Sequence, residues 1–342
     1  MKKILVLGGT GAMGVYLTPE LLDMGYAVDV VSLDNIGSEK PNLRYITANA
    51  LDNGVLAELL KNEYDGIIDF LIYDDPENSF APRRDMLLEN TSHYIFLSSY
   101  RVYAGADKIT TEESPRLLDV SEDKQFLDSY KTEYSLYKAV GENLLRQAKK
   151  SNYTIVRPAI TYSKLRFQLT ILEAQILVER MRSGKTVVLP EQAMTVQGTM
   201  SWAGDVAKML ARLVLNKDAF GEVYTVSTAE HRSWGEIAEY YREIGSLKYI
   251  TVDKEEFLQI MSGGNGVWNG LKWQLEYDRL FDRVMDNSKI LDITGMKQSE
   301  LMPLYEGLCL ELSRLPQKVC WQWRDNGVNA AMDRFLSEKI SG

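Results

Sequence analysis

A serine, a tyrosine and a lysine are spaced for acid–base chemistry on an alcohol. Tyr134 and Lys138 are four residues apart, so on a helix they lie one turn apart on the same face. A free tyrosine, with a pKa of about 10, is a poor base at neutral pH, and a neighbouring ammonium group favours its phenolate. Ser99 ends an apolar run, Tyr94–Ser98, and is suited to hold the reacting oxygen by hydrogen bonding. We therefore predict Ser99, Tyr134 and Lys138 as catalytic residues.

Three glycines near the start of the chain follow a short apolar run. They are Gly8, Gly11 and Gly14, placed between a predicted strand, Ile4–Leu7, and a predicted helix. The first glycine allows a tight turn, the second a close approach to a pyrophosphate, and the third close packing of helix on strand. The amino end of the helix adds a partial positive charge. By chance alone, about one tyrosine in this chain would be followed by a lysine four residues later. The glycine loop makes the spacing of Tyr134 and Lys138 informative. The predicted cofactor-binding residues of this loop are Gly8, Thr10, Gly11, Ala12, Met13 and Gly14.

An acidic residue, Asp34, follows the second predicted strand, Ala27–Ser32. A carboxylate there can accept hydrogen bonds from both ribose hydroxyls of NAD and would repel the 2′-phosphate of NADP. The alternative is an ordinary turn aspartate. We predict NAD as the cofactor, with Asp34 and Lys138 among its ligands.

The elements that must position these residues alternate between strands and helices. Short apolar runs separated by helical patterns are typical of βαβ units and a parallel sheet. The sequence therefore predicts an α/β fold, a Rossmann-like doubly wound parallel sheet with a smaller, mostly helical C-terminal unit. Further predicted strands are Leu43–Thr47, Gly66–Ile72, Tyr153–Arg157, Thr186–Leu189 and Val223–Val226, and predicted helices are Val55–Leu60, Phe167–Arg182 and Asp205–Leu215.

A chain of 342 residues exceeds what one hydrophobic core usually supports, so two units are expected. We predict an NAD-binding domain over residues 1–165, to which residues 190–230 return. Residues 166–189 and 231–342 are predicted to form a substrate-binding unit.

Composition excludes several other classes of function. A net charge of −9 argues against a nucleic-acid partner, because phosphate contacts need clustered cations. Two cysteines, Cys309 and Cys320, and two histidines, His93 and His231, suggest neither a disulfide framework nor a metal site. The histidines are expected to be structural or surface groups. No apolar run approaches a membrane span, and the first one is too short for a secretion signal, so we expect a cytoplasmic protein without membrane contact.

The chain resembles the extended short-chain dehydrogenase/reductase family, the NAD-dependent epimerase/dehydratases. The resemblance covers roughly the first 230 residues and rests on segments in a fixed order. It implies that Tyr134 is the catalytic acid/base, that Lys138 tunes it and binds the nicotinamide ribose, and that Ser99 positions a substrate hydroxyl. It also implies that the C-terminal unit holds the substrate, frequently a nucleotide-sugar. The segments are Gly8–Gly14, Asp34, Leu97–Tyr103, Tyr134–Lys138, Val156–Pro158, Gly204–Ala207 and, late in the chain, Asp286–Lys289.

Several residues depart from the family pattern. The stretch Asp69–Tyr73 replaces a His-Leu-Ala-Ala-like segment beside the nicotinamide, and Asn49 replaces an aspartate near the adenine. An arginine that contacts a sugar-nucleotide phosphate is missing from Gln197–Met200. Tyr100 and Arg101 stand where a 4,6-dehydratase has Asp-Glu, which argues against that chemistry.

The favoured hypothesis is an NAD-dependent epimerase of a sugar or nucleotide-sugar, working by transient hydride transfer with Tyr134 as acid/base. An NAD(P)-dependent reductase or dehydrogenase of a related substrate would use the same residues. A non-catalytic NAD-sensing protein, or an RNA-binding protein like the chloroplast relatives of the family, is a further alternative on the same fold. Relatives commonly form homodimers through helices of the sheet domain.

Overall fold

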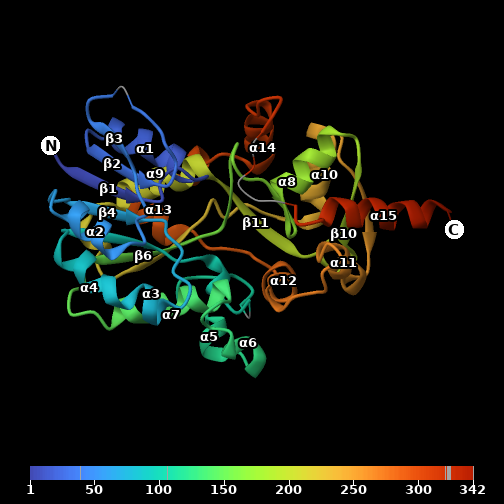
Figure 1. Cartoon of the computed structure of the whole chain (residues 1–342), viewed down its shortest axis with the longest axis horizontal. Helices are drawn as coiled ribbons and strands as arrows, with labels where there is room; N and C mark the ends of the chain where they lie inside the picture. The colour runs from blue at the N-terminus through green and yellow to red at the C-terminus, as the bar shows by residue number, and fades with distance from the viewer. Residues whose placement is uncertain (39, 106, 320, 322–324, 342) are drawn as a thin grey trace. The chain divides into compact units, whose positions relative to one another are not determined.

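The chain forms two compact units in the computed structural model, which describes residues 1–38, 40–105, 107–319, 321 and 325–341 (Figure 1). Residues 285–301, which the sequence analysis assigned to the substrate-binding unit, belong to the first unit. Cys309 is a free thiol, and Cys320 lies outside the described residues. The first unit comprises Met1–Thr161, Ser201–Ala229 and Met285–Leu301, and the second comprises Tyr162–Met200, Glu230–Val284 and Met302–Gly342.

The first unit is built on a seven-stranded parallel sheet in the order β12-β6-β5-β4-β1-β2-β3. This confirms the predicted Rossmann-like doubly wound sheet. The strands are β1 (Lys3–Leu7), β2 (Ala27–Ser32), β3 (Leu43–Thr47), β4 (Gly66–Asp69), β5 (His93–Leu97), β6 (Tyr153–Pro158) and β12 (Val223–Val226).

Helices cover both faces of this sheet because its central strands are apolar on both sides. Ile4 and Val6 of β1 face one hydrophobic cluster, to which helices α1, α9 and α13 contribute, and Leu5 and Leu7 face a second, to which α2, α4 and α7 contribute. The helices of the first unit are α1 (Gly14–Asp23), α2 (Asn53–Leu60), α3 (Pro76–Ser79), α4 (Ala81–Glu89), α5 (Leu117–Val120), α6 (Lys124–Asp128), α7 (Tyr134–Arg146), α9 (Ala203–Leu213) and α13 (Ser288–Thr294).

The strand order reverses between β1 and β4. From β1 the chain continues outward through β2 to β3, and from β4 it continues in the opposite direction through β5 and β6. Ligands of open α/β sheets bind outside the carboxyl ends of the strands at such a reversal. This rule places a site at Gly8, which follows β1, and at the segments that follow β4 and β5.

The second unit contains short strands and most of the remaining helices. Strands β10 and β14 pair in parallel, while β8 pairs with β9 and β11 with β13 in antiparallel fashion. Its strands are β8 (Gln168–Leu169), β9 (Leu172–Glu173), β10 (Thr186–Pro190), β11 (Gln197–Trp202, whose last two residues belong to the first unit), β13 (His231–Ser233) and β14 (Lys248–Val252), and β7 (Ile160–Tyr162) spans the boundary of the two units. Its helices are α8 (Ala174–Arg182), α10 (Trp234–Gly245), α11 (Lys254–Met261), α12 (Asn269–Gln274), α14 (Leu304–Ser313) and α15 (Val328–Ser341).

Two predicted elements are present but shorter than predicted. The predicted helix Phe167–Arg182 begins only at Ala174, because Thr170 adopts a left-handed φ of +51° and turns the chain between β8 and β9. The predicted strand Gly66–Ile72 ends at Asp69, whose side chain accepts a hydrogen bond from the backbone N–H of Leu71 (2.9 Å).

His93, at the start of β5, is a structural residue. Its Nε2 lies 2.8 Å from the hydroxyl of Thr154, which donates to the carbonyl of Ala219, and its Nδ1 accepts from the backbone N–H of Leu215 (2.9 Å). The proton therefore sits on Nε2 and the ring is neutral. Burial of the ring lowers the pKa of His93 to about 3.

We expect His93 to make the protein less stable in mild acid. The unfolded state takes up a proton at about pH 6.5 and the folded state does not, so stability falls as the pH drops below that value. Between pH 6.5 and 4.5 the free energy of unfolding should fall by about 2–3 kcal/mol more in the wild type than in His93→Gln. Urea unfolding at several pH values measures this difference, and parallel pH profiles would contradict it.

Candidate active site

The glycine loop after β1 has the backbone geometry of a phosphate-binding turn. Gly8 has a φ of +72°, a conformation that glycine adopts without strain, and its N–H donates to the Val31 carbonyl (2.8 Å). A Cβ atom at Gly14 would lie 2.2 Å from the carbonyl oxygen of Gly9, so only glycine lets α1 start this close to the turn. A Cβ atom at Gly11 would meet no other atom within 4 Å, so the backbone there is open to an approaching group. The loop therefore fits a pyrophosphate.

Helix α1 presents its amino end at the same loop. Met13 is its N-cap residue and makes no side-chain capping bond, and the first turn carries no acidic residue. The first N–H groups of a helix have no intrahelical acceptor, and the helix dipole favours an anion there. Thr10 and Ala12 are partly exposed beside this helix end.

Asp34 lies just beyond the carboxyl end of β2, with its backbone fixed and its side chain exposed. Its N–H donates to the hydroxyl of Ser32 (3.0 Å), and its carbonyl accepts from the hydroxyl of Thr47 (3.2 Å). These bonds anchor the turn and leave the carboxylate available to ribose hydroxyls.

Tyr134 and Lys138 come together on the first turns of α7. The ammonium of Lys138 lies 5.8 Å from the centre of the Tyr134 ring. Ser99 is 5% exposed, extends from the end of β5 and accepts a hydrogen bond from the backbone N–H of Arg101 (3.2 Å). The Leu97 carbonyl, two residues before Ser99, accepts from Lys138 (2.7 Å), so the lysine links α7 to the end of β5.

Lys138 is fully enclosed by the first unit. It is 1% exposed and also donates to the Leu71 carbonyl beyond β4 (3.3 Å). Burial lowers the pKa of Lys138, while the charges of Tyr134, Asp69 and Glu142 oppose that shift. Two of its three ammonium hydrogens therefore serve the protein, and one is left for a ligand.

The last residue of β4 is a buried carboxylate, Asp69. Its Oδ1 accepts from the N–H of Leu71 (2.9 Å), and its Oδ2 accepts from the hydroxyls of Tyr73 (2.7 Å) and Tyr94 (2.8 Å). Asp69 is 1% exposed. We call Asp69, Tyr73 and Tyr94 the Asp69 cluster.

The surroundings of Tyr134 include residues that the sequence analysis did not assign to the site. The guanidinium of Arg101 lies 5.1 Å from the centre of its ring, and Tyr137 packs edge-on against it at 5.4 Å. Glu133, the N-cap of α7, accepts from the backbone N–H of Ser135 and pairs with Arg101 (3.0 Å). Arg101 follows Ser99 by two residues, and this closeness in the sequence could have identified it as a neighbour of the site.

A buried network of charged side chains lies next to the site and is centred on Glu142 of α7. Glu142 is fully buried and accepts from the hydroxyl of Ser98 (2.6 Å), from Arg157 (2.7 and 2.8 Å) and from Arg116 (3.0 Å). Hydrogen bonds and charges from Arg157, with help from Ser98 and Arg116, outweigh desolvation and lower the pKa of Glu142. Since Glu142 lies one turn beyond Lys138, its helical spacing could have identified it.

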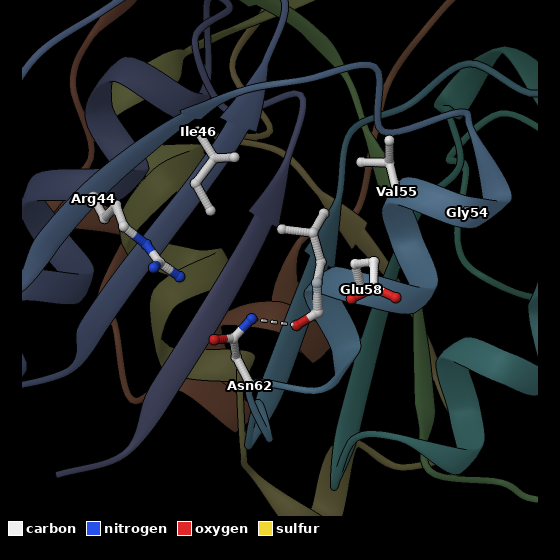
Figure 2. Close-up of a pocket in the computed structure, with 7 residues that line it drawn as sticks. Arg44, Ile46, Gly54, Val55, Glu58 and Asn62 are labelled. Atoms are coloured by element: carbon white, nitrogen blue, oxygen red, sulfur yellow. Dashed lines mark hydrogen bonds between the residues drawn. The ribbon is translucent and has the colours of Figure 1, made fainter.

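A surface pocket of about 510 Å³ lies elsewhere in the first unit (Figure 2). Figure 2 shows Arg44 and Ile46 on β3 across from Val55 and Glu58 on α2, with Asn62 just beyond that helix. None of its lining residues is a predicted site residue, so the pocket does not mark the proposed chemistry.

Within the described residues, no group of three or more His, Cys, Asp or Glu side chains is placed to hold a metal ion. Among the helices described, none is both long and apolar enough to cross a membrane.

Solved structures with the same fold include several epimerases. The UDP-glucuronic acid 4-epimerase of Bacillus cereus, solved with UDP-glucuronic acid and NAD, matches with a TM-score of 0.64 at 18% identity, covering 91% of this chain and 98% of that one. The UDP-glucose 4-epimerase of Thermotoga maritima, solved with UDP-glucose, matches with a TM-score of 0.64 at 19% identity, covering 91% and 97%. The enzyme WbmH of Bordetella bronchiseptica, solved with NAD⁺, matches with a TM-score of 0.65 at 15% identity, covering 92% and 98%. At these identities the likeness establishes the fold.

Family membership comes from the sequence itself. No curated protein matches the chain. Residues 4–227 match the NAD dependent epimerase/dehydratase family, a segment that includes every predicted site residue. This match confirms the predicted resemblance, the NAD cofactor and an enzyme of this type. The chain belongs to the NAD dependent epimerase/dehydratase family.

Proposed function

We propose that the chain is an NAD-dependent epimerase of a nucleotide-sugar, with Tyr134 as its acid/base. The observation that carries this proposal is the position of Lys138. Its ammonium lies beside the Tyr134 ring and binds one carbonyl just beyond β4 and one at the end of β5, while the glycine loop follows β1, which neighbours β4. The acid/base pair and the phosphate loop therefore meet at three neighbouring strand ends.

Each residue has a distinct task in this proposal. Tyr134 takes the proton of a substrate hydroxyl, and the charge of Lys138 favours the phenolate that does so. Ser99 already accepts a bond from Arg101, so its own O–H remains to donate to the reacting oxygen. NAD, when bound, supplies a reversible acceptor for the hydride that leaves the carbon. Tyr134 then returns its proton to the oxygen once the carbon has been reduced on its other face.

The cofactor and substrate assignments have separate support. The exposed Asp34 carboxylate favours NAD over NADP. UDP-glucuronic acid and UDP-glucose are bound in structures of the same fold, and they define the substrate class to be tested. All predicted site residues lie in the first unit. The assignment of the sugar-nucleotide contacts to the second unit rests on the family resemblance alone.

The test is epimerisation of a panel of nucleotide-sugars. The protein would be incubated with NAD and, separately, UDP-glucose, UDP-galactose, UDP-glucuronic acid or UDP-galacturonic acid, with products resolved by proton NMR. We expect one pair to interconvert without net formation of NADH at 340 nm. Stoichiometric NADH would instead indicate a dehydrogenase, and absence of NAD binding would contradict the proposal entirely.

A further inference from the structure

The Asp69 cluster occupies the segment where the chain departs from its family. Asp69 makes all three of its hydrogen bonds as an acceptor, from Leu71, Tyr73 and Tyr94, which is the arrangement of an ionised carboxylate. Burial, reinforced by the Asp69 charge, raises the pKa of Tyr73 and Tyr94 well above the ordinary range, so both remain donors. The cluster is thus a fixed negative charge with two neutral hydroxyls.

Leu71 connects this cluster to the acid/base pair. Its N–H is bound by Asp69, and its carbonyl accepts from the ammonium of Lys138 (3.3 Å). The neighbouring Phe70 donates its N–H to the Leu7 carbonyl (2.9 Å), and a Cβ atom at Gly8 would lie 3.4 Å from the Leu71 side chain and 3.5 Å from that of Phe70. The segment held by Asp69 therefore touches the phosphate loop on one side and Lys138 on the other.

We propose that Asp69 is a positioning residue that fixes the Leu71 carbonyl for Lys138 and keeps the lysine charged at the cofactor. This inference rests on the proposed function, because it assumes that Lys138 contacts the nicotinamide ribose. Few other charges face the lysine: Tyr134 and Glu142 on its own helix, and Asp69 from β4. On the far side of the cluster, Arg83 of α4 lies 5.3 Å from the Tyr73 ring and binds the Leu51 carbonyl.

The charge of Asp69 opposes the desolvation of Lys138. Glu142 is already neutralised by Arg157 and Arg116, whereas Asp69 is bound only by uncharged donors. An opposite charge in a low-dielectric site is screened little, so its removal should destabilise the ammonium.

The chain contains a matched control at β2. Asp29 is 5% exposed and accepts from the hydroxyl of Tyr64 (2.5 Å), and Tyr64 is 3% exposed. Asp29 pairs with Arg44 and Lys3, and none of its hydrogen bonds or ion pairs within the described residues goes to Lys138 or the glycine loop. Asp29→Asn and Tyr64→Phe therefore repeat the same chemical changes away from the site.

The experiment measures the affinity of the full chain for NADH by fluorescence titration at several pH values between 6 and 10. Affinity should weaken as Lys138 loses its proton, and Lys138→Met should abolish this transition. In Asp69→Asn we expect the transition to move down by about one pH unit or more. It should stay in place in Asp29→Asn.

A second pair of variants tests the positioning of the Leu71 carbonyl without changing any charge. This pair keeps the inference testable even if Asp69→Asn does not fold. Tyr73→Phe removes one bond to the carboxylate, so the Kd for NADH at pH 7 should rise about three- to tenfold, with the pH transition unmoved. Tyr64→Phe should leave this Kd unchanged. A transition unmoved in Asp69→Asn, or an unchanged Kd in Tyr73→Phe, overturns the inference. Absence of NADH binding at any pH, or a transition that survives in Lys138→Met, contradicts the proposed function instead and the inference with it.

Discussion

Tyr134→Phe should lower kcat for epimerisation by about 10²- to 10⁴-fold, the range expected when a positioned acid/base is lost. Within the described part of the chain, no group hydrogen-bonds the Tyr134 hydroxyl, and its ring contacts with Arg101, Tyr137 and Lys138 remain in phenylalanine. The affinity for NADH and the thermal stability should therefore stay at their wild-type values. Turnover would be measured on the substrate identified by the panel.

The matched control for this variant is Tyr130→Phe. Tyr130 lies on the chain just before α7, and its hydroxyl donates to the carboxylate of Glu77 (3.1 Å) at the surface. It should retain wild-type turnover. Wild-type turnover by Tyr134→Phe, with its fold intact, would exclude Tyr134 as the acid/base.

Glu142→Ala should destabilise the protein by about 3–5 kcal/mol, because it leaves buried arginine charges without a partner. The side chains of Arg157 and Arg116 are 2% and 9% exposed. Urea unfolding followed by circular dichroism measures the change. Glu58→Ala removes an exposed glutamate that pairs with Lys61, and its effect should stay within about 1 kcal/mol.

The loss of stability in Glu142→Ala should depend on pH. The folded state lowers the pKa of Glu142 from an ordinary value near 4.5, so the stabilisation is present above that pH and is lost as the pH falls below it. The difference between wild type and Glu142→Ala should therefore narrow in acid. A constant difference down to pH 3 would show that the charge of Glu142 is not what stabilises the fold.

The parts of the fold that rest on local patterns were predictable. Strands β2, β3 and β12 have the predicted bounds because each is a short apolar or β-branched run between turn residues. Helical spacing correctly brought Tyr134 and Lys138 together. Strand β14 was missed, because only the last of its five residues is buried and its pairing partner β10 lies about 60 residues earlier.

The support of the site depends on contacts that sequence spacing does not encode. Tyr94 reaches Asp69 across 25 positions, and Arg116 reaches Glu142 across 26. In the sequence, an aspartate near the end of a strand looks the same whether its side chain faces solvent, as that of Asp34 does, or accepts hydrogen bonds from two buried hydroxyls, as that of Asp69 does. Only the packing of neighbouring strands distinguishes these two environments. The sequence therefore showed that Asp69–Tyr73 differs from the family pattern, but it did not show the structural role of this segment.

The path of the chain through the first unit constrains when that unit can fold during synthesis. Strand β12 completes the sheet, and α9 and α13 cover one of its faces, yet these elements come from Ser201–Ala229 and Met285–Leu301. Until they leave the ribosome, the apolar face formed by Ile4, Val6 and Val156 lacks its full cover. During most of translation the incomplete sheet therefore exposes hydrophobic surface. A growing chain depends on chaperones in this period.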